Sequence, residues 1–343
     1  MKIISIVGAR PQFIKLAPLS REIRKSHEEI IIHTGQHYDS EMSALFFEQL
    51  EIPEPDVNLE VGSGTHGQQT ATMLIRIEEQ IQRIKPDLVL SFGDTNSTLA
   101  ACLTASKQKI FSLHIEAGLR SFNRSMPEEI NRIVADHTSD LLFVPTEDAM
   151  NNLRQEGLLE KAILTGDIMA DSVQFVQRKI DSNQKKNKNY ILLTLHRPYN
   201  VDDGDQLQLF FHRLAQLDYE IVFPVHPRTQ KIISMNSISL PENLKIVEPQ
   251  GYIEFQTLLK YCTKVVTDSG GLQKEAYIAG KPCITIRAET EWVETVRAGW
   301  NKLVDIGDEN LLNEIKDFFP EGERPNLYGR DVAKRMVTEI NQI

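Results

Sequence analysis

The sequence predicts an α/β protein made of two Rossmann-like domains, each a doubly wound parallel sheet. Short, apolar, partly β-branched runs alternate with helix-like segments along the whole chain, as in parallel strands joined by crossover helices. The stretch Asp181–Asn189 is polar and lysine-rich and has no apolar period, which is typical of an exposed linker. With 343 residues, each half is long enough to bury its own core.

We expect a first domain over residues 1–180 and a second over residues 190–330. Strands of the first are predicted at Ile3–Val7, Glu29–Thr34, Leu88–Phe92, Ile110–Ile115, Leu141–Val144 and Ala162–Leu164. Strands of the second are predicted at Tyr190–Leu195, Glu220–Pro224, Leu244–Val247, Lys264–Thr267, Cys283–Ile286 and, more weakly, Leu303–Val304. Residues 331–343 predict an amphipathic helix that packs back on the first domain. A ligand cleft is expected between the two domains.

Composition narrows the class of protein. The net charge of −10 and the pI of about 5.5 argue against general binding to nucleic acid or to anionic membrane surfaces. No apolar run reaches the roughly 18 residues of a membrane span, and the apolar N-terminal run is too short for a signal peptide. Cys102, Cys262 and Cys283 lie far apart in apolar stretches, which predicts reduced thiols in a cytoplasmic protein. No histidine–cysteine spacing predicts a metal site.

Three carboxylates form the main candidate site. Asp94, Glu116 and Glu128 each sit at the end of an apolar run, and the first two follow predicted strands. Since parallel strands end at one sheet edge, where open α/β proteins bind ligands, these acids predict proton chemistry on a bound molecule. Each acid alone could instead be a helix cap or a salt-bridge partner. The spacing of Glu128 and Arg132 would fit a plain i, i+4 helical pair, with Pro127 at the first helical position.

The first loop, Gly8 to Lys15, is a candidate anion site. Gly8 permits a tight turn, and the helix that follows would offer free N–H groups to an anion, with charge added by Arg10 and Lys15. The loop is neither a G-x-G-x-x-G nor a Walker sequence. An ordinary turn beside a surface arginine and lysine explains the pattern equally well.

A second glycine-rich segment follows the predicted strand Lys264–Thr267. Ser269, Gly270 and Gly271 begin a helix, and this arrangement could hold a diphosphate on backbone and hydroxyl groups. Glu275 lies about one turn into the helix and could accept hydrogen bonds from ribose hydroxyls. The alternative is a serine N-cap with a glycine-rich turn.

Two His/Arg pairs also follow predicted strands. His196 and Arg197 come after one strand of the second domain, and His226 and Arg228 come after the next. A lone histidine at such a place is usually structural, but two pairs at one sheet edge suit phosphate and sugar hydroxyls. The other histidines carry no signal of their own: His27, His33, His37, His66, His114, His137 and His212.

With these motifs in order, the chain resembles the non-hydrolysing UDP-N-acetylglucosamine 2-epimerases, which have the two-domain fold called GT-B. The resemblance covers nearly the whole chain. Its motifs are G-A-R-P-Q-F-I-K, G-D-T-N-S-T, H-I-E-A-G-L-R-S, M-P-E-E-I-N-R, the H-R of T-L-H-R-P, P-V-H-P-R and D-S-G-G-L-Q-K-E-A.

The resemblance implies a reversible inversion at C2 of UDP-N-acetylglucosamine, through elimination of UDP to a 2-acetamidoglucal and its re-addition. It implies no cofactor and no metal, and a UDP-sugar as the bound partner. It also implies a cytoplasmic homodimer that supplies N-acetylmannosamine units for surface polysaccharide or glycan synthesis.

By motif, the resemblance also implies site residues. The acid/base and charge-stabilising carboxylates would be Asp94, Glu116 and Glu128, with His196 as a donor near the diphosphate or sugar. Diphosphate contacts would be Arg10, Ser269, Gly270 and Gly271, with Glu275 on the ribose and Phe255 in the uracil-binding segment. Lys15 and Arg132 would be supporting charges. His226 would be a further contact, and its motif match is the least specific of these.

Some positions depart from the family pattern. Many members read H-R-R-E-N where this chain has Pro198 and Tyr199 after His196-Arg197, and T-E-R-P-E where it has Trp292, so Arg287 would have to substitute. The residues after Gln36, from His37 to Glu41, lack the glutamines of members activated by their own substrate. The alternatives are therefore a hydrolysing relative, an epimerase of a uronate or diacetamido sugar nucleotide, or a glycosyltransferase of the same fold.

Overall fold

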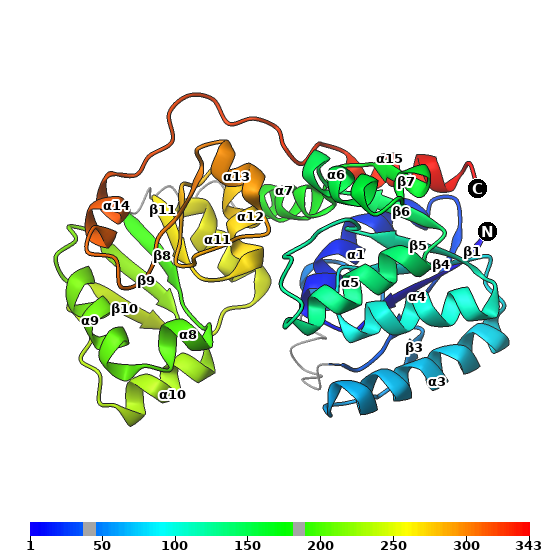
Figure 1. The fold of residues 1–343 in the computed structure, drawn as a ribbon, viewed down its shortest axis with the longest axis horizontal. Helices are drawn as coiled ribbons and strands as arrows, with labels where there is room; N and C mark the ends of the chain where they lie inside the picture. Colours follow the sequence, from blue (N-terminus) through cyan, green and yellow to red (C-terminus); the bar gives the residue numbers. More distant parts are fainter. Residues whose placement is uncertain (37–45, 181–188) are drawn as a thin grey trace. The chain divides into compact units, whose positions relative to one another are not determined.

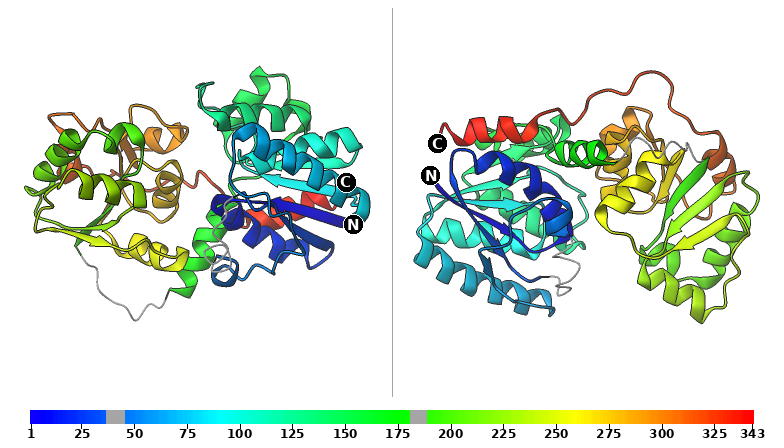
Figure 2. Two further views of the ribbon diagram at one scale, coloured as in Figure 1. Left: turned by 90° about the horizontal axis from the view of Figure 1, so that it is seen from below. Right: turned by 180° about the vertical axis from the view of Figure 1, so that it is seen from behind.

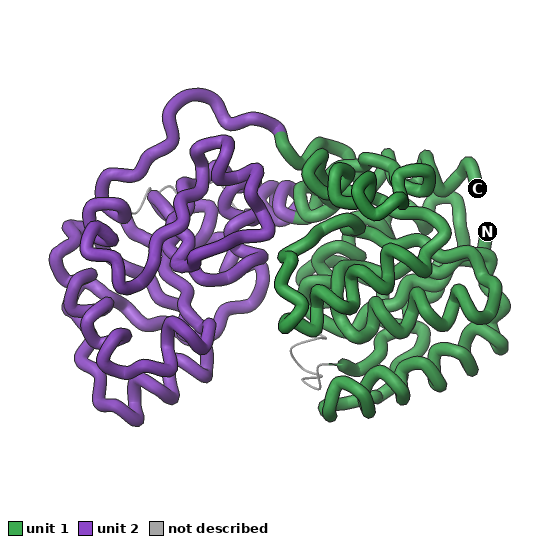
Figure 3. The backbone as a smooth tube through the Cα atoms, in the orientation of Figure 1, with its two compact units in different colours: residues 1–172, 327–343 green, residues 173–326 purple. Residues whose placement is uncertain are grey.

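A computed structural model describes residues 1–36, 46–180 and 189–343. The chain divides into two compact units (Figure 3). Unit 1 consists of Met1–Ser172 together with Leu327–Ile343, and unit 2 of Val173–Asn326. Helix α7 (Met169–Lys179) carries the chain from the first unit into the second.

Unit 1 is built on a seven-stranded sheet in which every strand pair is parallel. The strand order is β3-β2-β1-β4-β5-β6-β7. The strands are β1 (Lys2–Val7), β2 (Glu28–His33), β3 (Val57–Asn58), β4 (Leu88–Phe92), β5 (Phe111–Ile115), β6 (Leu141–Val144) and β7 (Ala162–Leu164). Because β1, β4 and β5 are neighbours, the segments that follow them meet at one edge of the sheet.

The helices of unit 1 connect these strands (Figure 1). They are α1 (Arg10–Ile23), α3 (His66–Ile84), α4 (Asn96–Gln108), α5 (Pro127–Thr138) and α6 (Glu147–Gln155), with a short 3₁₀ turn at Leu159–Lys161. The C-terminal helix α15 (Val332–Ile340) packs against α1, which joins the two ends of the chain within one unit (Figure 2). Asp171 in α7 accepts a hydrogen bond of 2.8 Å from the Ala333 N–H in the first turn of α15.

Unit 2 has a six-stranded sheet, again with parallel pairs only, in the order β10-β9-β8-β11-β12-β13. Its strands are β8 (Tyr190–Thr194), β9 (Glu220–Pro224), β10 (Leu244–Val247), β11 (Lys264–Thr267), β12 (Cys283–Thr285) and β13 (Asn301–Leu303). Its helices are α8 (Pro198–Val201), α9 (Gly204–Leu214), α10 (Pro227–Met235), α11 (Tyr252–Tyr261), α12 (Gly270–Ile278), α13 (Val293–Arg297) and α14 (Leu311–Asp317).

Both faces of this second sheet are buried by helices. Along β8, Ile191 and Leu193 pack with the apolar side of α9 in one cluster, whereas Leu192 packs with α11 and α12 in another. Successive side chains of a strand point to opposite faces, so two separate clusters require cover on both sides. This explains why the strand is apolar from Tyr190 to Leu193, and it is the doubly wound arrangement that the sequence predicts.

The predicted fold class is confirmed, and most strand positions are correct to within one residue. The pair Val57–Asn58 was not predicted as a strand, because a two-residue strand leaves no apolar run to recognise. The weak strand predicted at Leu303–Val304 begins earlier, at Asn301. Most of the predicted linker, residues 181–188, lies outside the described residues, as do residues 37–41, on which the question of activation by substrate depends.

The contact between α7 and α15 provides a test of how the C-terminal helix is held. We expect Asp171→Ala to lower the free energy of unfolding by about 1 kcal/mol, because it removes the acceptor for a first-turn amide of α15. Lys334→Ala, which removes only an exposed pair with Asp331, should lower the free energy of unfolding much less than Asp171→Ala does. Urea unfolding and hydrogen exchange of the α15 amides measure both. Equal effects of the two substitutions would show that Asp171 does not anchor the helix.

Candidate functional site

Glu116 and Lys15 form a buried ion pair at the carboxyl edge of the sheet in unit 1. Glu116 follows β5, and its carboxylate contacts the Lys15 ammonium from α1; the two side chains are only 8% and 6% exposed. The backbone of Glu116 has φ of 73°, a left-handed conformation that is unusual for a residue other than glycine. Such strain is common at functional sites, and here it accompanies a buried carboxylate.

The turn after β4 passes directly beneath this pair. Gly93 has φ of 65°, and a Cβ atom at this position would lie 3.0 Å from the Lys15 Nζ and 3.4 Å from a carboxylate oxygen of Glu116. A side chain would therefore be strained in its backbone and crowded by the pair. Glycine at 93 avoids both effects, and the chain continues from it directly into Asp94.

Asp94 is held by Arg132 of α5. One guanidinium nitrogen of Arg132 donates to the Asp94 carboxylate, and the other donates to Glu129 at 3.2 Å. Asn131 from the same helix donates to the Asp94 backbone carbonyl at 3.0 Å. The second turn of α5 therefore fixes both the backbone and the carboxylate of Asp94.

Glu128 does not form the i, i+4 ion pair with Arg132 that its spacing suggested. Arg132 contacts Glu129 at i−3 and Asp94, and Glu128 is exposed and forms no hydrogen bond or ion pair with the described residues. Glu129 was not singled out from the sequence. It is 1% exposed and accepts bonds from the backbone N–H groups of Ser121 and Phe122, so it ties the loop before α5 to Arg132.

In the first loop, a side chain of the loop itself binds backbone N–H groups that the sequence analysis had left open for an anion. Gln12 accepts from the Gly8 and Ala9 N–H groups at 2.7 and 3.1 Å, so these two amides are not left for an anion. Gly8 is needed for a close approach rather than for a positive φ, since a Cβ there would lie 1.9 Å from the Thr34 hydroxyl. Arg10 is exposed, with its guanidinium 5.4 Å from the centre of the Phe46 ring.

In unit 2 the two predicted histidines lie side by side. The rings of His196 and His226 are 5.6 Å apart between centres. His226 caps α10, because its Nδ1 accepts from the Arg228 N–H at 3.2 Å, and Arg228 itself pairs with exposed Asp202. His226 is thus placed by helix capping, next to His196.

His196 is oriented by Asp268, a residue that the sequence analysis did not single out. The fully buried Asp268 carboxylate lies 3.1 Å from the His196 Nδ1 and accepts from the backbone N–H groups of His196 and Arg197. Burial by itself would raise the pKa of Asp268, but the hydrogen bond and charge of His196 and these amides outweigh it and lower the pKa. An ionised Asp268 keeps the Nδ1 of His196 protonated and leaves Nε2 for other contacts.

The glycine-rich start of α12 has one crowded and one open glycine. Ser269 is the N-cap residue, but its side chain makes no capping hydrogen bond, so the serine N-cap alternative does not account for it. A Cβ at Gly270 would lie 2.5 Å from a carboxylate oxygen of Glu291, whereas one at Gly271 would meet nothing within 4 Å. Gly271 therefore leaves the helix start open to an approaching molecule.

Glu275 and Phe255 lie on neighbouring helices, α12 and α11. Phe255 packs partly buried against the core cluster that includes Leu259 and Leu272. The Gln256 amide donates to Glu275, which is 8% exposed. Burial raises the pKa of Glu275 from its ordinary value of 4.5 to about 7, only partly offset by Gln256 and nearby Lys274. Glu275 is therefore a carboxyl group able to exchange a proton near neutral pH.

Trp292 occupies the place where many family members have an arginine. It is 5% exposed, and the Lys274 ammonium lies 4.2 Å from the centre of its ring. Arg287 pairs with Glu291 at 3.0 Å, and Glu291 in turn lies against Gly270. The positive charge next to α12 thus comes from Lys274 and Arg287.

Two further properties concern the described residues as a whole. None of their helices is both long and apolar enough to span a membrane. Nor do three or more of their His, Cys, Asp or Glu side chains gather in a group that could hold a metal ion.

Comparison with known proteins shows the family to which the chain is similar. Residues 21–341 match the family model described as UDP-N-acetylglucosamine 2-epimerase. A Methanococcus maripaludis protein named as a UDP-N-acetylglucosamine 2-epimerase homolog is 50% identical, with 99% of each chain covered. A Pseudomonas aeruginosa protein named UDP-2,3-diacetamido-2,3-dideoxy-D-glucuronate 2-epimerase is 45% identical, again with 99% of each covered. The crystal structure of Methanocaldococcus jannaschii UDP-GlcNAc 2-epimerase with UDP-GlcNAc and UDP has a TM-score of 0.90 at 42% identity, with complete coverage of both chains.

The raised pKa of Glu275 gives a prediction for stability. A folded-state pKa above the unfolded one stabilises the protein below about pH 4.5, and this contribution is lost as the pH rises through about 7. We therefore expect ligand-free Glu275→Gln to be more stable than the wild type at pH 8, on the order of 2 kcal/mol, and about equal to it near pH 4.5. Denaturant unfolding across this range measures the difference. Exposed Glu242→Gln is the control and should change neither value; a pH-independent difference for Glu275→Gln would contradict the assignment.

Proposed function

Because the chain belongs to the UDP-N-acetylglucosamine 2-epimerase family, we propose that it interconverts UDP-N-acetylglucosamine and UDP-N-acetylmannosamine without hydrolysing the product. The observation that carries this proposal is the placement of Asp94 and Glu116 at the ends of neighbouring strands, each against a cation of the same unit. Inversion at C2 needs proton transfer on both faces of the sugar, and two fixed carboxylates at one sheet edge suit that requirement.

The C2 hydrogen of the sugar is not next to a carbonyl carbon, so its direct removal as a proton would be difficult. In the proposed route the bond between C1 and the diphosphate oxygen breaks, and UDP leaves with the bonding electrons. Loss of the C2 proton then gives a 2-acetamidoglucal. Protonation of C2 from the other face and return of UDP to C1 complete the inversion, with no net change of atoms or charge.

In unit 1, the proposal assigns the proton transfers and the stabilisation of a cation-like C1 to Asp94, Glu116 and Glu128. Lys15 and Arg132 hold two of these carboxylates in place and keep charge balanced around them. Glu128 has no hydrogen-bonding partner among the described residues, so its carboxylate remains available to a ligand.

The other contacts of the proposal are with UDP. In unit 2, His196 donates to the diphosphate or sugar, Ser269, Gly270 and Gly271 hold the diphosphate, and Glu275 accepts from the ribose. Phe255 belongs to the uracil-binding segment, and His226 supports His196. Arg10 of unit 1 also contacts the diphosphate. The orientation of His196 by Asp268 and the open start of α12 at Gly271 support this assignment.

We also propose that the enzyme works as a homodimer in the cytoplasm. Support for the dimer comes from the family resemblance, and support for the compartment comes from the three buried, unpaired cysteines. The products of the reaction would then be available to cytoplasmic enzymes that build sugar polymers.

A second candidate is the epimerisation of a diacetamido uronate sugar nucleotide. It is favoured by the 45% identity to the Pseudomonas aeruginosa protein named for such a substrate. It also fits the departures from the family pattern at Tyr199 and Trp292, since Tyr199 lies within electrostatic range of Arg197 and Arg287. We expect a different sugar substituent to be contacted by residues that depart from the family pattern, as Tyr199 and Trp292 do.

Proton NMR of the purified protein with UDP-N-acetylglucosamine in deuterated water and a chelator tests the proposal. We expect UDP-N-acetylmannosamine with deuterium at C2, because the proton returned to C2 comes from solvent. Free N-acetylmannosamine with UDP would identify a hydrolysing relative and contradict the non-hydrolysing reaction. Turnover of only the diacetamido uronate would favour the second candidate, and turnover only with an added sugar acceptor would indicate a glycosyltransferase.

The carboxylates are tested by replacing them with isosteric amides. We expect Asp94→Asn and Glu116→Gln each to lower kcat by at least about 100-fold, because an amide cannot accept or return the C2 proton. UDP affinity, measured by calorimetry, should remain within a few-fold of wild type, since the proposed diphosphate contacts are other residues. Exposed Glu309→Gln is the matched control, with unchanged kcat. Wild-type turnover in either site variant would remove that residue from the mechanism.

A further inference from the structure

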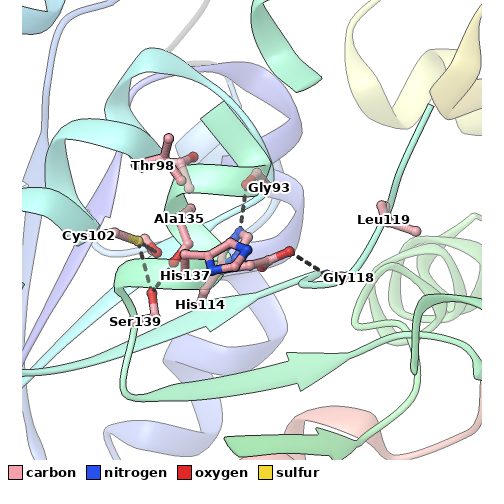
Figure 4. Close-up of polar contacts among 12 residues, drawn as sticks. Gly93, Thr98, Cys102, His114, Gly118, Leu119, Ala135, His137 and Ser139 are labelled. Carbon is pink, nitrogen blue, oxygen red and sulfur yellow. Dashed lines mark hydrogen bonds and ion pairs between the residues drawn. The ribbon is translucent and has the colours of Figure 1, made fainter. Parts of the chain in front are cut away.

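His114 is a fully buried histidine of β5 whose two ring nitrogens both face acceptors. Its Nδ1 lies 2.7 Å from a carboxylate oxygen of Asp136, and its Nε2 lies 2.7 Å from the backbone carbonyl oxygen of Gly93. The contact with Gly93 is drawn in Figure 4. A carbonyl oxygen can only accept, so the Nε2 must carry a hydrogen.

The Asp136 side also requires His114 to donate. The other carboxylate oxygen of Asp136 accepts from the Gly118 N–H at 3.0 Å and from an Arg120 nitrogen at 2.7 Å. Burial alone would raise the pKa of Asp136, but His114 and Arg120 together outweigh burial and lower the pKa. Asp136 is therefore a carboxylate with no proton to give, and the Nδ1 of His114 must carry a hydrogen as well.

The surrounding charges allow a buried cation here. Arg120 bridges Asp136 and Glu156, with two bonds of 2.7 Å to the latter, so two cations and two anions balance. Two further groups that can carry positive charge lie nearby, Lys161 and His137, with Asp140 as an additional anion beside Lys161. Lys161 donates to the backbone carbonyl of Asp136, and His137 faces Glu156 rather than Asp136. Burial raises the pKa of Cys102 to about 11, so this nearby thiol is neutral.

We propose that His114 is a buried imidazolium, donating from both ring nitrogens, that positions the Gly93–Asp94 turn for the reaction. Its charge-assisted bond fixes the Gly93 carbonyl, and the same peptide unit leads directly into Asp94. Gly93 is also the residue over which the Lys15–Glu116 pair lies. One buried cation therefore sets the backbone between two carboxylates to which the proposed function assigns proton transfer. The positioning role rests on that function, whereas the charge state of His114 does not.

The charge state is tested on the wild-type protein by NMR of the histidine ring nitrogens, without substrate. We expect both ring nitrogens of His114 to carry a hydrogen at pH 7, because each lies 2.7 Å from an oxygen that can only accept. His33 is the internal control. It is also buried, but its Nδ1 accepts from the Gly35 N–H at 2.9 Å, so it should show a single protonated nitrogen. A single protonated nitrogen on His114 at pH 7 would overturn the proposal.

The positioning role is tested by kinetics on Asp136→Asn and His114→Gln. Asp136→Asn removes the charge that requires a hydrogen on the Nδ1 of His114, so we expect a lower kcat and a pH profile that differs from that of the wild type. In folded His114→Gln we expect kcat about 100-fold lower with UDP affinity within about three-fold, the effect of a misplaced catalytic group. A proportionate loss of UDP affinity, or an unchanged pH profile in Asp136→Asn, would leave His114 a purely structural residue.

These outcomes are distinguishable from failure of the proposed function. If the wild-type protein turns over none of the sugar nucleotides, the epimerase proposal fails while the NMR result on His114 still stands or falls by itself. If Asp136→Asn or His114→Gln does not fold, circular dichroism shows it, and the wild-type NMR measurement then decides the charge state.

Discussion

The parallel pairing of β1, β4 and β5 is the constraint on which the candidate site in unit 1 depends. Their carboxyl ends meet at one edge, so Lys15 and Glu116, 101 positions apart in the chain, can form a buried ion pair. The same geometry in unit 2 gathers His196 after β8, His226 after β9 and Asp268 after β11. Each unit therefore presents its polar groups where its own sheet ends.

Burying these polar groups is possible because each buried carboxylate has a partner already in place. Asp136 has His114 and Arg120, Asp268 has His196 and backbone amides, and Glu116 has Lys15. An unpaired buried carboxylate would cost several kcal/mol, whereas a paired one is fixed in position before any ligand binds. For a reaction that moves a proton and separates a diphosphate from a sugar, such fixed charges need no rearrangement at the moment of bond breaking.

The strands and the strand-end residues could be predicted because both follow from local sequence. A buried parallel strand is a continuous apolar run, and the residue after it must lie at the carboxyl edge. What could not be predicted was which side chains pair across the fold. Gln12 reaches a partner 86 positions away, Glu129 one 8 positions away and Asp268 one 72 positions away, and neither apolar period nor motif spacing encodes such contacts. His114 could not be singled out for the same reason, since its role depends on its contacts with Gly93 and Asp136, which only the fold brings together.

The region beside α12 shows how a buried cation can be accommodated. Trp292 is buried against the ammonium of Lys274, which is itself 1% exposed. A lysine in such a place needs the negative face of an aromatic ring or an anion to offset its lost hydration, and the indole supplies that face. Arg287, paired with Glu291 beside Gly270, lies next to the same helix start. The positive charge in this region is thus held by Lys274 against the indole of Trp292 and by Arg287 against Glu291.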